Sequence, residues 1–279
     1  MSTPSPAPLY DLNDGTRLPG VGLGTYPMDD AAAERAVAEA LNAGYRLVDT
    51  AVRYGNEAGT GRGVRASGVP REEVVVATKL PGREHGYEQT LASFEESRQR
   101  LGLEYVDLYL IHWPLPRVDK YVDSWRAMVK LREEGVVRSI GVSNFTAAHV
   151  DRLERETGVL PSVNQVELHP LLPQAELRAQ MAAKGVAVES WSPLGRKSDL
   201  LTSSAVAAVA EAHGRTPAQV VLRWHVQLGA VPIPKSGDPR RQRENLDVFG
   251  FELTEQEMAA IASGEQRRLG GDPDTHEEF

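Results

Sequence analysis

The stretch AAAERAVAEALNAGYRLVDTAVRYGNE, residues 31–57, holds one repeating unit of the fold that the sequence predicts. Its first half has apolar residues at helical spacing, and Gly44 follows where a glycine helix cap belongs. Leu47 and Val48 have the character of a buried strand, but that strand ends in the carboxylate of Asp49. Tyr54 comes shortly afterwards. The stretch therefore predicts a helix, a buried strand and a polar strand end at which chemistry can occur.

The same alternation continues along the whole chain. Helix-like stretches such as YEQTLASFEESRQRLG and DSWRAMVKLREEG lie between short apolar runs, and most of them end in glycine. Strands that alternate with helices of this length indicate parallel βαβ units, and eight such units in 279 residues predict a (β/α)8 TIM barrel in the α/β class. The strand candidates are residues 21–24, 47–48, 74–77, 106–111, 139–142, 163–166, 186–188 and 231–233.

Additional elements are expected at both ends of the barrel. The turn sequence NDG at residues 13–15 predicts an N-terminal β-hairpin. Extra helices are expected late in the chain, at residues 201–213 and 254–263. We therefore expect a disordered tail at residues 1–8, followed by a single barrel domain over residues 9–279 with a short C-terminal tail.

A doubly wound nucleotide-binding sheet is the main alternative architecture. That fold needs the pattern G-x-G-x-x-G at a turn from a strand into a helix. Gly20, Gly22 and Gly24 have the spacing G-x-G-x-G instead, and no helix begins there. We interpret these glycines as a strand and turn at which backbones approach closely.

Composition excludes several classes of protein. The 31 Lys and Arg residues against 39 Asp and Glu residues give a net charge of −8, which argues against nucleic acid or an anionic membrane as the partner. The chain has no cysteine, which excludes disulfides, a thiolate nucleophile and Cys-ligated metal sites. The start, MSTPSPAPLY, lacks the features of a signal peptide, and no apolar run approaches the roughly 20 residues that span a bilayer. We expect a soluble, cytoplasmic protein.

Polar residues at the ends of three successive strands form the candidate catalytic group. Asp49, Lys79 and His112 should converge on one face, because active sites of such barrels lie at the C-terminal ends of the strands. Tyr54 lies in the loop above them. A neighbouring cation lowers the pKa of an acid, so we expect Lys79 to bring the phenol of Tyr54 into the range useful for proton transfer.

Each candidate also has a structural explanation. Asp49 could form a turn or cap a helix, Lys79 could extend along the surface, and His112 and Tyr54 could simply pack. Trp191 could be a core residue, and Lys235 with Arg241 could belong to a solvated charged face. His169 could be a metal ligand, but no second histidine and carboxylate set lies near it in sequence, so we favour a structural or pocket-lining role.

Seven motifs occur in one order along the chain and carry a resemblance. They are GYRLVDTAVRYGNE, ATKL, LIHWP, GVSNF, NQVELHP, WSPLG and IPKS. Together they resemble the aldo-keto reductase family, over nearly the whole chain from the hairpin to about Phe251. The version ESWSPLGR is most similar to the bacterial branch near the 2,5-diketo-D-gluconic acid reductases.

The resemblance implies an NADPH-dependent carbonyl reductase on a (β/α)8 barrel, without a metal. Tyr54 matches the proton donor, Asp49 and Lys79 match its charge partners, and His112 matches the residue that orients the carbonyl group. Hydride would pass from the nicotinamide of the cofactor to the carbonyl carbon. The implied substrate-binding residues are Tyr26, Tyr54, His112 and Trp113.

The resemblance also implies an NADPH site across the mouth of the barrel. Trp191 matches an aromatic residue that stacks on the nicotinamide, and hydrogen-bonding side chains match the contacts to its carboxamide. Lys235 and Arg241 suit the 2′-phosphate, because guanidinium and ammonium groups bind phosphate well. The sequence GDPRR departs from the usual small residues after Lys-Ser, which puts the phosphate geometry in doubt. The implied cofactor residues are Gly24, Thr25, Ser143, Asn144, Gln165, Trp191, Ser192, Leu194, Gly195, Lys235, Ser236, Arg241, Glu244 and Asn245.

Substrate identity does not follow from the motifs. The final segment, RRLGGDPDTHEEF, is short and polar, and we expect from it an open pocket with broad acceptance. One alternative is a regulatory barrel that binds the cofactor but turns over little, and another is a metal-dependent barrel enzyme. The family resemblance favours a monomer.

Overall fold

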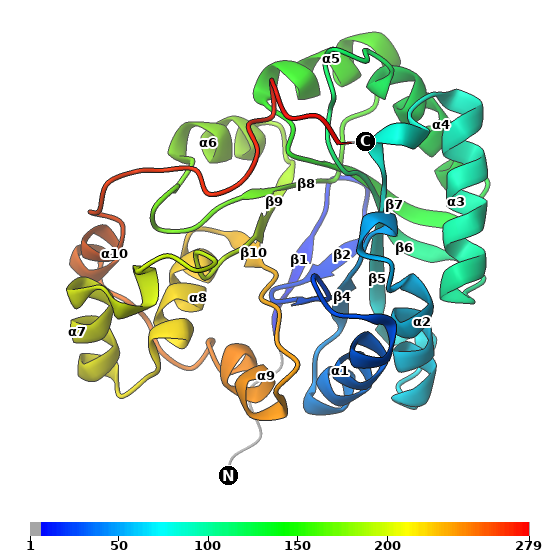
Figure 1. The fold of residues 1–279 in the computed structure, drawn as a ribbon. Coiled ribbons are helices and arrows are strands. Elements are labelled where there is room, and N and C mark those ends of the chain that lie inside the picture. Colours follow the sequence, from blue (N-terminus) through cyan, green and yellow to red (C-terminus); the bar gives the residue numbers. More distant parts are fainter. Residues whose placement is uncertain (1–6, 279) are drawn as a thin grey trace.

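The computed structural model describes residues 7–278. Eight parallel strands follow one another in chain order, each paired with the next. Helices cover the outside of this curved sheet (Figure 1). The strands are β3 Leu23–Gly24, β4 Leu47–Asp49, β5 Val75–Leu80, β6 Val106–Ile111, β7 Val137–Ser143, β8 Val163–Glu167, β9 Ala187–Trp191 and β10 Ala230–Pro232.

The first and last strands close the sheet into a barrel. The Gly22 amide donates to the carbonyl oxygen of Pro232, and the Gly24 amide to that of Pro234, each at 3.0 Å. A Cβ atom at Gly22 would lie 2.6 Å from the side chain of Ile233. The close approach that the sequence suggested for these glycines is therefore a strand contact, and the (β/α)8 barrel is confirmed.

Local capping chemistry explains where many helices begin and end. Asp29 accepts a hydrogen bond from the amide of Ala32 at the start of α1, and Gly44 ends that helix with a φ of 113°. Glycine tolerates this left-handed conformation because it lacks a Cβ atom. The helices are α1 Asp30–Ala43, α2 Glu57–Ala66, α3 Tyr87–Leu101, α4 Tyr121–Glu133, α5 Ala147–Thr157, α6 Ala175–Ala183, α7 Ser204–His213, α8 Pro217–Gln227, α9 Pro239–Leu246 and α10 Glu255–Ile261.

Two late helices, α7 and α10, confirm the expected additional elements, and each of their ends lies within three residues of the expected one. Helix α9 lies in a segment that we interpreted only as a phosphate site. The signal was present, because Asp238 is a helix-capping residue and Pro239 suits the first helical turn.

The predicted hairpin is confirmed as β1 Leu9–Asp11 paired with β2 Arg17–Pro19. Leu12 and Leu18 pack into the inner core of the barrel with Leu47 and other strand residues, so the hairpin covers one end of the barrel. Residues 1–6 of the expected tail lie outside the described residues. The carbonyl oxygen of Pro8 accepts a hydrogen bond from the amide of Gly20.

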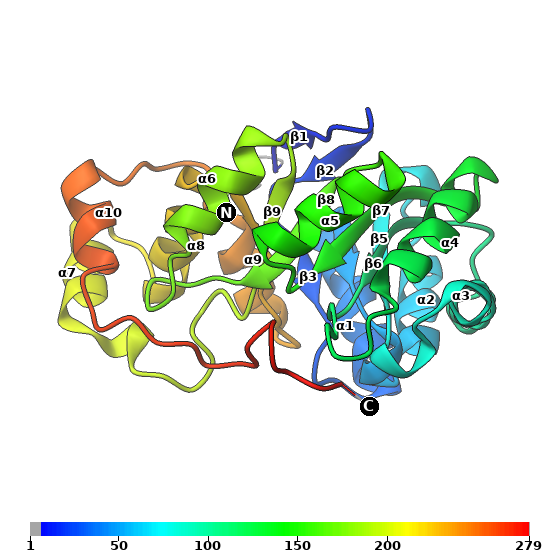
Figure 2. The same cartoon turned by 90° about the horizontal axis from the view of Figure 1, so that it is seen from above.

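The chain returns to the opposite end of the barrel after α10. Residues 267–278, which we call the C-terminal strap, cross the face at which the strands end (Figures 1 and 2). No helix within residues 7–278 is both long enough and apolar enough to cross a membrane.

Candidate active site

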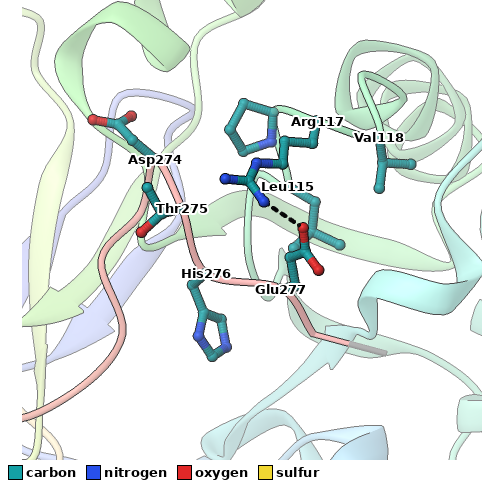
Figure 3. Close-up of a pocket in the computed structure, with 8 residues that line it drawn as sticks. Leu115, Arg117, Val118, Asp274, Thr275, His276 and Glu277 are labelled. Carbon is teal, nitrogen blue, oxygen red and sulfur yellow. Dashed lines mark hydrogen bonds and ion pairs between the residues drawn. The ribbon is translucent and has the colours of Figure 1, made fainter.

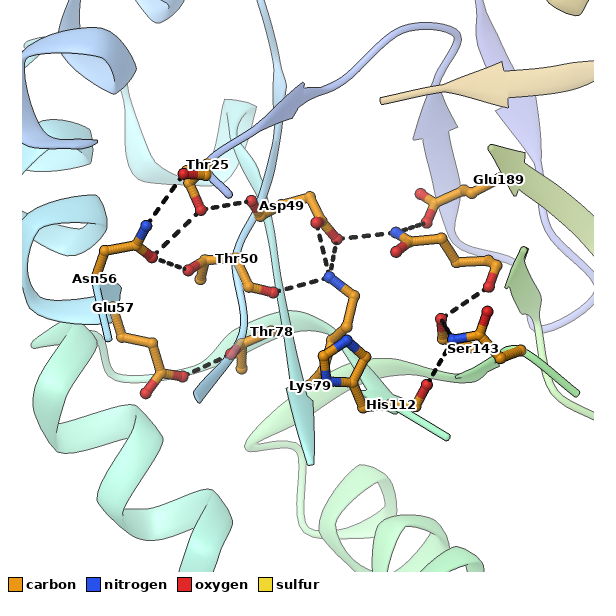
Figure 4. A network of polar contacts seen from close by, with 12 residues as sticks. Thr25, Asp49, Thr50, Asn56, Glu57, Thr78, Lys79, His112, Ser143 and Glu189 are labelled. Atoms are coloured by element: carbon orange, nitrogen blue, oxygen red, sulfur yellow. Dashed lines mark hydrogen bonds and ion pairs between the residues drawn. The ribbon is translucent and has the colours of Figure 1, made fainter. Parts of the chain in front are cut away.

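Asp49 and Lys79 form the buried centre of the polar network at the strand ends (Figure 4). The ammonium group of Lys79 donates to both carboxylate oxygens of Asp49 at 2.7 Å and to the carbonyl oxygen of Thr50 at 3.0 Å. Burial opposes the charge of Lys79, but Asp49, Tyr54 and Glu189 together outweigh burial and raise the pKa of the lysine above its ordinary value. Lys79 therefore stays charged inside the barrel.

Tyr54 lies at the end of a short 3-10 turn, Val52–Tyr54, directly above this pair. The ammonium of Lys79 is 5.2 Å from the centre of the Tyr54 ring. Burial raises the pKa of Tyr54 above its ordinary value, although the nearby charge of Lys79 acts to lower it. Our expectation of a lowered pKa was wrong, because desolvation and the carboxylates of Asp49 and Glu278 oppose the effect of the lysine. The phenol is accordingly protonated at neutral pH.

His112 follows β6 and faces Tyr54, with 5.9 Å between the ring centres. The carbonyl oxygen of His112 accepts a hydrogen bond from the side chain of Asn144 at 2.9 Å. The structure thus brings the four predicted catalytic residues together at one end of the barrel.

Gln165 joins the charged pair to a further buried acid, Glu189. Its side-chain nitrogen donates to Asp49 at 2.9 Å and to Glu189 at 2.8 Å. Burial raises the pKa of Glu189 to about 8. No pattern in the sequence assigns a role to Glu189, because only the barrel brings β4, β8 and β9 to one point.

Asn56 is a second residue whose role the sequence did not reveal. Its side-chain oxygen accepts hydrogen bonds from Thr50 at 2.7 Å and from Thr25 at 3.3 Å. Its nitrogen donates to the carbonyl oxygens of Thr25 and Met28. This buried amide holds the loop that carries Tyr54 against the loop after β3 (Figure 4).

The residues expected around the nicotinamide form one hydrogen-bonded group. The hydroxyl of Ser143 donates to the carbonyl oxygen of Gln165 at 2.8 Å, and the indole N–H of Trp191 donates to the side chain of Asn144 at 2.7 Å. Because two carboxylates fix the nitrogen of the Gln165 side chain, its oxygen is the end directed away from them. An outward amide oxygen fits the NH2 donor of a carboxamide.

The loop after β9 carries the next three expected residues. Ser192 and Gly195 have φ angles of 50° and 71°, and the Gly195 amide donates to the carbonyl oxygen of Ser192. Leu194 is half-buried between them and packs against the main core. Gly24 ends β3 and Thr25 follows it, and β3 contacts the segment after β10, the strand paired with β9. The hydroxyl of Thr25 donates to the carbonyl oxygen of Asp49, which ties it to the catalytic strand.

The expected phosphate residues surround the start of α9. Lys235 and Arg241 are exposed, whereas Ser236 and Asn245 are buried. Asp238 caps the helix by accepting from the amides of Arg240 and Arg241, which places a carboxylate next to the proposed phosphate position. Glu244 is half-buried and lies 3.8 Å from Arg240.

The pocket walls differ from our expectation of an open site. Tyr26 is 60% exposed, and its ring centre lies 5.0 Å from that of Tyr54. Trp113 is covered by His276 of the C-terminal strap, with 4.0 Å between the ring centres. The C-terminal strap therefore closes one side of the site. Its residues, 267–278, reach the site only through tertiary packing.

His169 and Glu167 form a fully buried contact of 3.0 Å. Glu167 also accepts hydrogen bonds from the amides of Leu269 and Gly270, so it anchors the strap. Among residues 7–278, no group of three or more His, Cys, Asp or Glu side chains has an arrangement suited to a metal ion.

Comparison with known proteins gives a consistent result. Residues 20–265 match the Aldo/keto reductase family. The chain is 56% identical to 2,5-diketo-D-gluconic acid reductase B of a Corynebacterium species, over 98% of this chain and 99% of that protein. It is 54% identical to an aldo-keto reductase of Mycolicibacterium smegmatis, over 96% of this chain and 98% of that one.

Solved structures are similar over the same length. A mutant of Gox0644 in complex with NADPH has a TM-score of 0.93 at 43% identity, over 98% of this chain and all of that chain. The Bombyx mori aldo-keto reductase in complex with NADP has a TM-score of 0.88 at 36% identity, over 96% of each chain.

Proposed function

Because the chain belongs to the aldo/keto reductase family and is an NADP-dependent oxidoreductase, we propose that it reduces small aldehydes, ketones or dicarbonyls with Tyr54 as the proton donor. The observation that carries this proposal is the position of the Tyr54 ring, 5.2 Å from the ammonium of Lys79, which is itself paired with Asp49 inside the barrel. A cytoplasmic location and a monomeric state belong to the same proposal and stay predictions.

The chemistry assigned to Tyr54 follows from its surroundings. NADPH, when bound, supplies the hydride for the carbonyl carbon. The carbonyl oxygen then gains negative charge, and the hydroxyl of Tyr54 gives it a proton. Lys79 stabilises the phenolate that remains, and Asp49 holds the lysine in place. His112 faces Tyr54 and orients the carbonyl oxygen between the two side chains.

The residues proposed to hold NADPH have the chemistry that its parts require. The outward oxygen of Gln165 suits the carboxamide, and the half-buried Trp191 offers an aromatic surface. Lys235 and Arg241 offer exposed positive charge for the 2′-phosphate, while the carboxylate of Asp238 opposes that charge at the helix start. Ser143, Asn144, Ser192, Leu194, Gly195, Ser236, Glu244, Asn245, Gly24 and Thr25 complete the proposed site.

The test follows loss of NADPH absorbance with a panel of aldehydes and α-dicarbonyls, and compares NADPH with NADH. Replacement of Tyr54 by Phe removes the proton donor, so kcat/KM should fall by roughly 10²–10⁴-fold while NADPH still binds. Tyr105→Phe is the control, because Tyr105 packs under Arg71 and Arg138 away from the site.

Two outcomes would contradict the proposal. Tight NADPH binding by the wild type without turnover of any carbonyl compound would favour the regulatory alternative. Full activity in Tyr54→Phe would remove the assignment of the proton donor.

A further inference from the structure

The C-terminal strap is fastened at its beginning and inserts a carboxylate into the site at its end. Glu167 accepts hydrogen bonds from the amides of Leu269 at 2.6 Å and Gly270 at 2.9 Å. Glu277 binds Arg117 at 2.9 Å (Figure 3). The strap therefore crosses the barrel mouth along a defined path, and its residue Glu278 reaches the catalytic end.

Glu278 is held by groups from three separate loops. Its carboxylate accepts a hydrogen bond from the amide of Gly82 at 3.0 Å. It also lies 2.8 Å from Nδ1 of His112 and 3.4 Å from Nε of Arg53, and only 3% of its side chain is exposed. Nδ1 of His112 therefore lies at ion-pair distance from the carboxylate without forming a hydrogen bond to it. An acid is thus buried directly beside a proposed catalytic residue.

Several features indicate that this position suits a carboxylate. A Cβ atom at Gly82 would lie 2.3 Å from the backbone oxygen of Glu278, so only glycine permits this approach. Burial acts to raise the pKa of Glu278, yet His112, the Gly82 amide and Arg53 together lower it below its ordinary value. A backbone amide, a guanidinium group and an imidazole are the groups that proteins use to bind a carboxylate.

We infer that Gly82, Arg53 and His112 form a subsite for an acid group of the substrate, and that Glu278 occupies this subsite while the strap is closed. This inference rests on the proposed function, because His112 also faces the position proposed for the carbonyl oxygen. The acid group must then be adjacent to the carbonyl group, as in a 2-oxo acid. Such a substrate enters by displacing Glu278, which makes the strap an internal competitor.

The test compares phenylglyoxylate with its uncharged methyl ester, at saturating NADPH. Glu278→Gln removes the competing charge and keeps the shape of the side chain. It should lower KM for both compounds by about tenfold with kcat unchanged, since a charge-assisted contact is worth about that factor. Arg53→Met should instead lower the ratio of kcat/KM for phenylglyoxylate to kcat/KM for its methyl ester by about tenfold, because the substitution removes a ligand of the subsite.

Glu277→Gln is the matched control, because Glu277 binds Arg117 at the surface and lies next to Glu278 in the strap. Glu277→Gln should leave KM and kcat unchanged for both compounds. A fall in kcat or a rise in KM for both compounds in Glu278→Gln would overturn the inference, since Glu278 would then support catalysis instead of blocking it. An unchanged preference in Arg53→Met would also overturn it.

Binding of benzoate separates this inference from the proposed function, because it needs no turnover. Displacement of the strap moves His276 from Trp113, so tryptophan fluorescence reports opening. Benzoate should change the fluorescence of the wild type and bind about tenfold more tightly to Glu278→Gln. Equal benzoate affinity in the two proteins would refute the subsite, even where neutral aldehydes are reduced normally. If the wild type reduces no carbonyl compound but Glu278→Gln still binds benzoate more tightly, the proposed function is refuted and the acid subsite is not.

Discussion

Glu189 shows how the barrel interior controls protonation at the scale of one residue. One of its oxygens accepts from Gln165, the other is buried without a hydrogen-bond partner among residues 7–278, and Asp49 lies close by. Burial disfavours the charged form of Glu189, and the neighbouring Asp49 disfavours it further. Together they raise the pKa of Glu189 to about 8. Near neutral pH, Glu189 is therefore mostly neutral, whereas Lys79 keeps its charge.

This raised pKa predicts a pH-dependent stability. The folded state binds the Glu189 proton more tightly than the unfolded state, in which the pKa of this side chain is near its ordinary value of 4.5. The free energy of unfolding should therefore fall as pH rises from about 4.5 through about 8, by an amount on the order of a few kcal/mol. Glu189→Gln should flatten this part of the profile, as measured by urea unfolding from pH 5 to 9. Replacement of the exposed Glu211 by Gln is the control, and an unchanged slope in Glu189→Gln would contradict the assignment.

Helices α1 and α2 show how backbone contact between elements positions the site. The Gly59 amide donates to the carboxylate of Asp30 at 2.7 Å. A Cβ atom at Gly59 would lie 1.9 Å from the carbonyl oxygen of Asp30, which no real Cβ atom can do. Because α2 begins just after the loop of Tyr54 and Asn56, this contact fixes that loop relative to the barrel.

Gly59→Ala should therefore separate the two helices. We expect a loss of about 1–3 kcal/mol in the free energy of unfolding, the usual range for an overpacked contact. Chemical denaturation measures this loss. Gly250→Ala is the matched control, since its nearest atom would be the end of Arg215 at 3.7 Å. Equal stability of the two variants would show that the helices adjust without strain.

The whole molecule gathers the proposed cofactor site from neighbouring segments at the barrel mouth. Trp191 ends β9, whereas Lys235 and Arg241 surround the start of α9, which follows β10. These segments keep a fixed separation because β10 pairs with β9, and the Ile233 amide donates to the carbonyl oxygen of Ser190. A ligand that touches both segments should stabilise the whole domain.

Thermal unfolding with cofactor tests this arrangement. NADPH should raise Tm more than NADH at equal concentration, since binding to the folded state alone stabilises it. The double variant Lys235→Met and Arg241→Leu should lose this difference and bind NADPH about 10²–10⁴-fold more weakly, because each of the two charged contacts is worth about 1.5–3 kcal/mol. Arg243→Leu, near the other end of α9, is the control. A preserved NADPH advantage in the double variant would place the 2′-phosphate elsewhere.

The order of helices and strands follows from local chemistry that the sequence displays directly. Gly44 ends α1 because of its φ angle, and β4 is buried because Leu47 and Val48 are apolar. Asp49, Lys79 and His112 could be expected to converge because the ends of parallel strands meet on one face of a barrel. These features depend on neighbours in the chain or on the symmetry of the fold, so the residues themselves are sufficient to predict them.

Three features depend instead on groups that are distant in sequence and close in space. The raised pKa of Tyr54 results from desolvation, which no local pattern encodes. The bridge from Asp49 through Gln165 to Glu189 exists only because three strands meet inside the barrel. Glu278 belongs to a polar segment that we expected to leave the pocket open, yet Gly82 and His112 hold it inside. Burial and long-range contact arise only on folding, and they alone decide these properties.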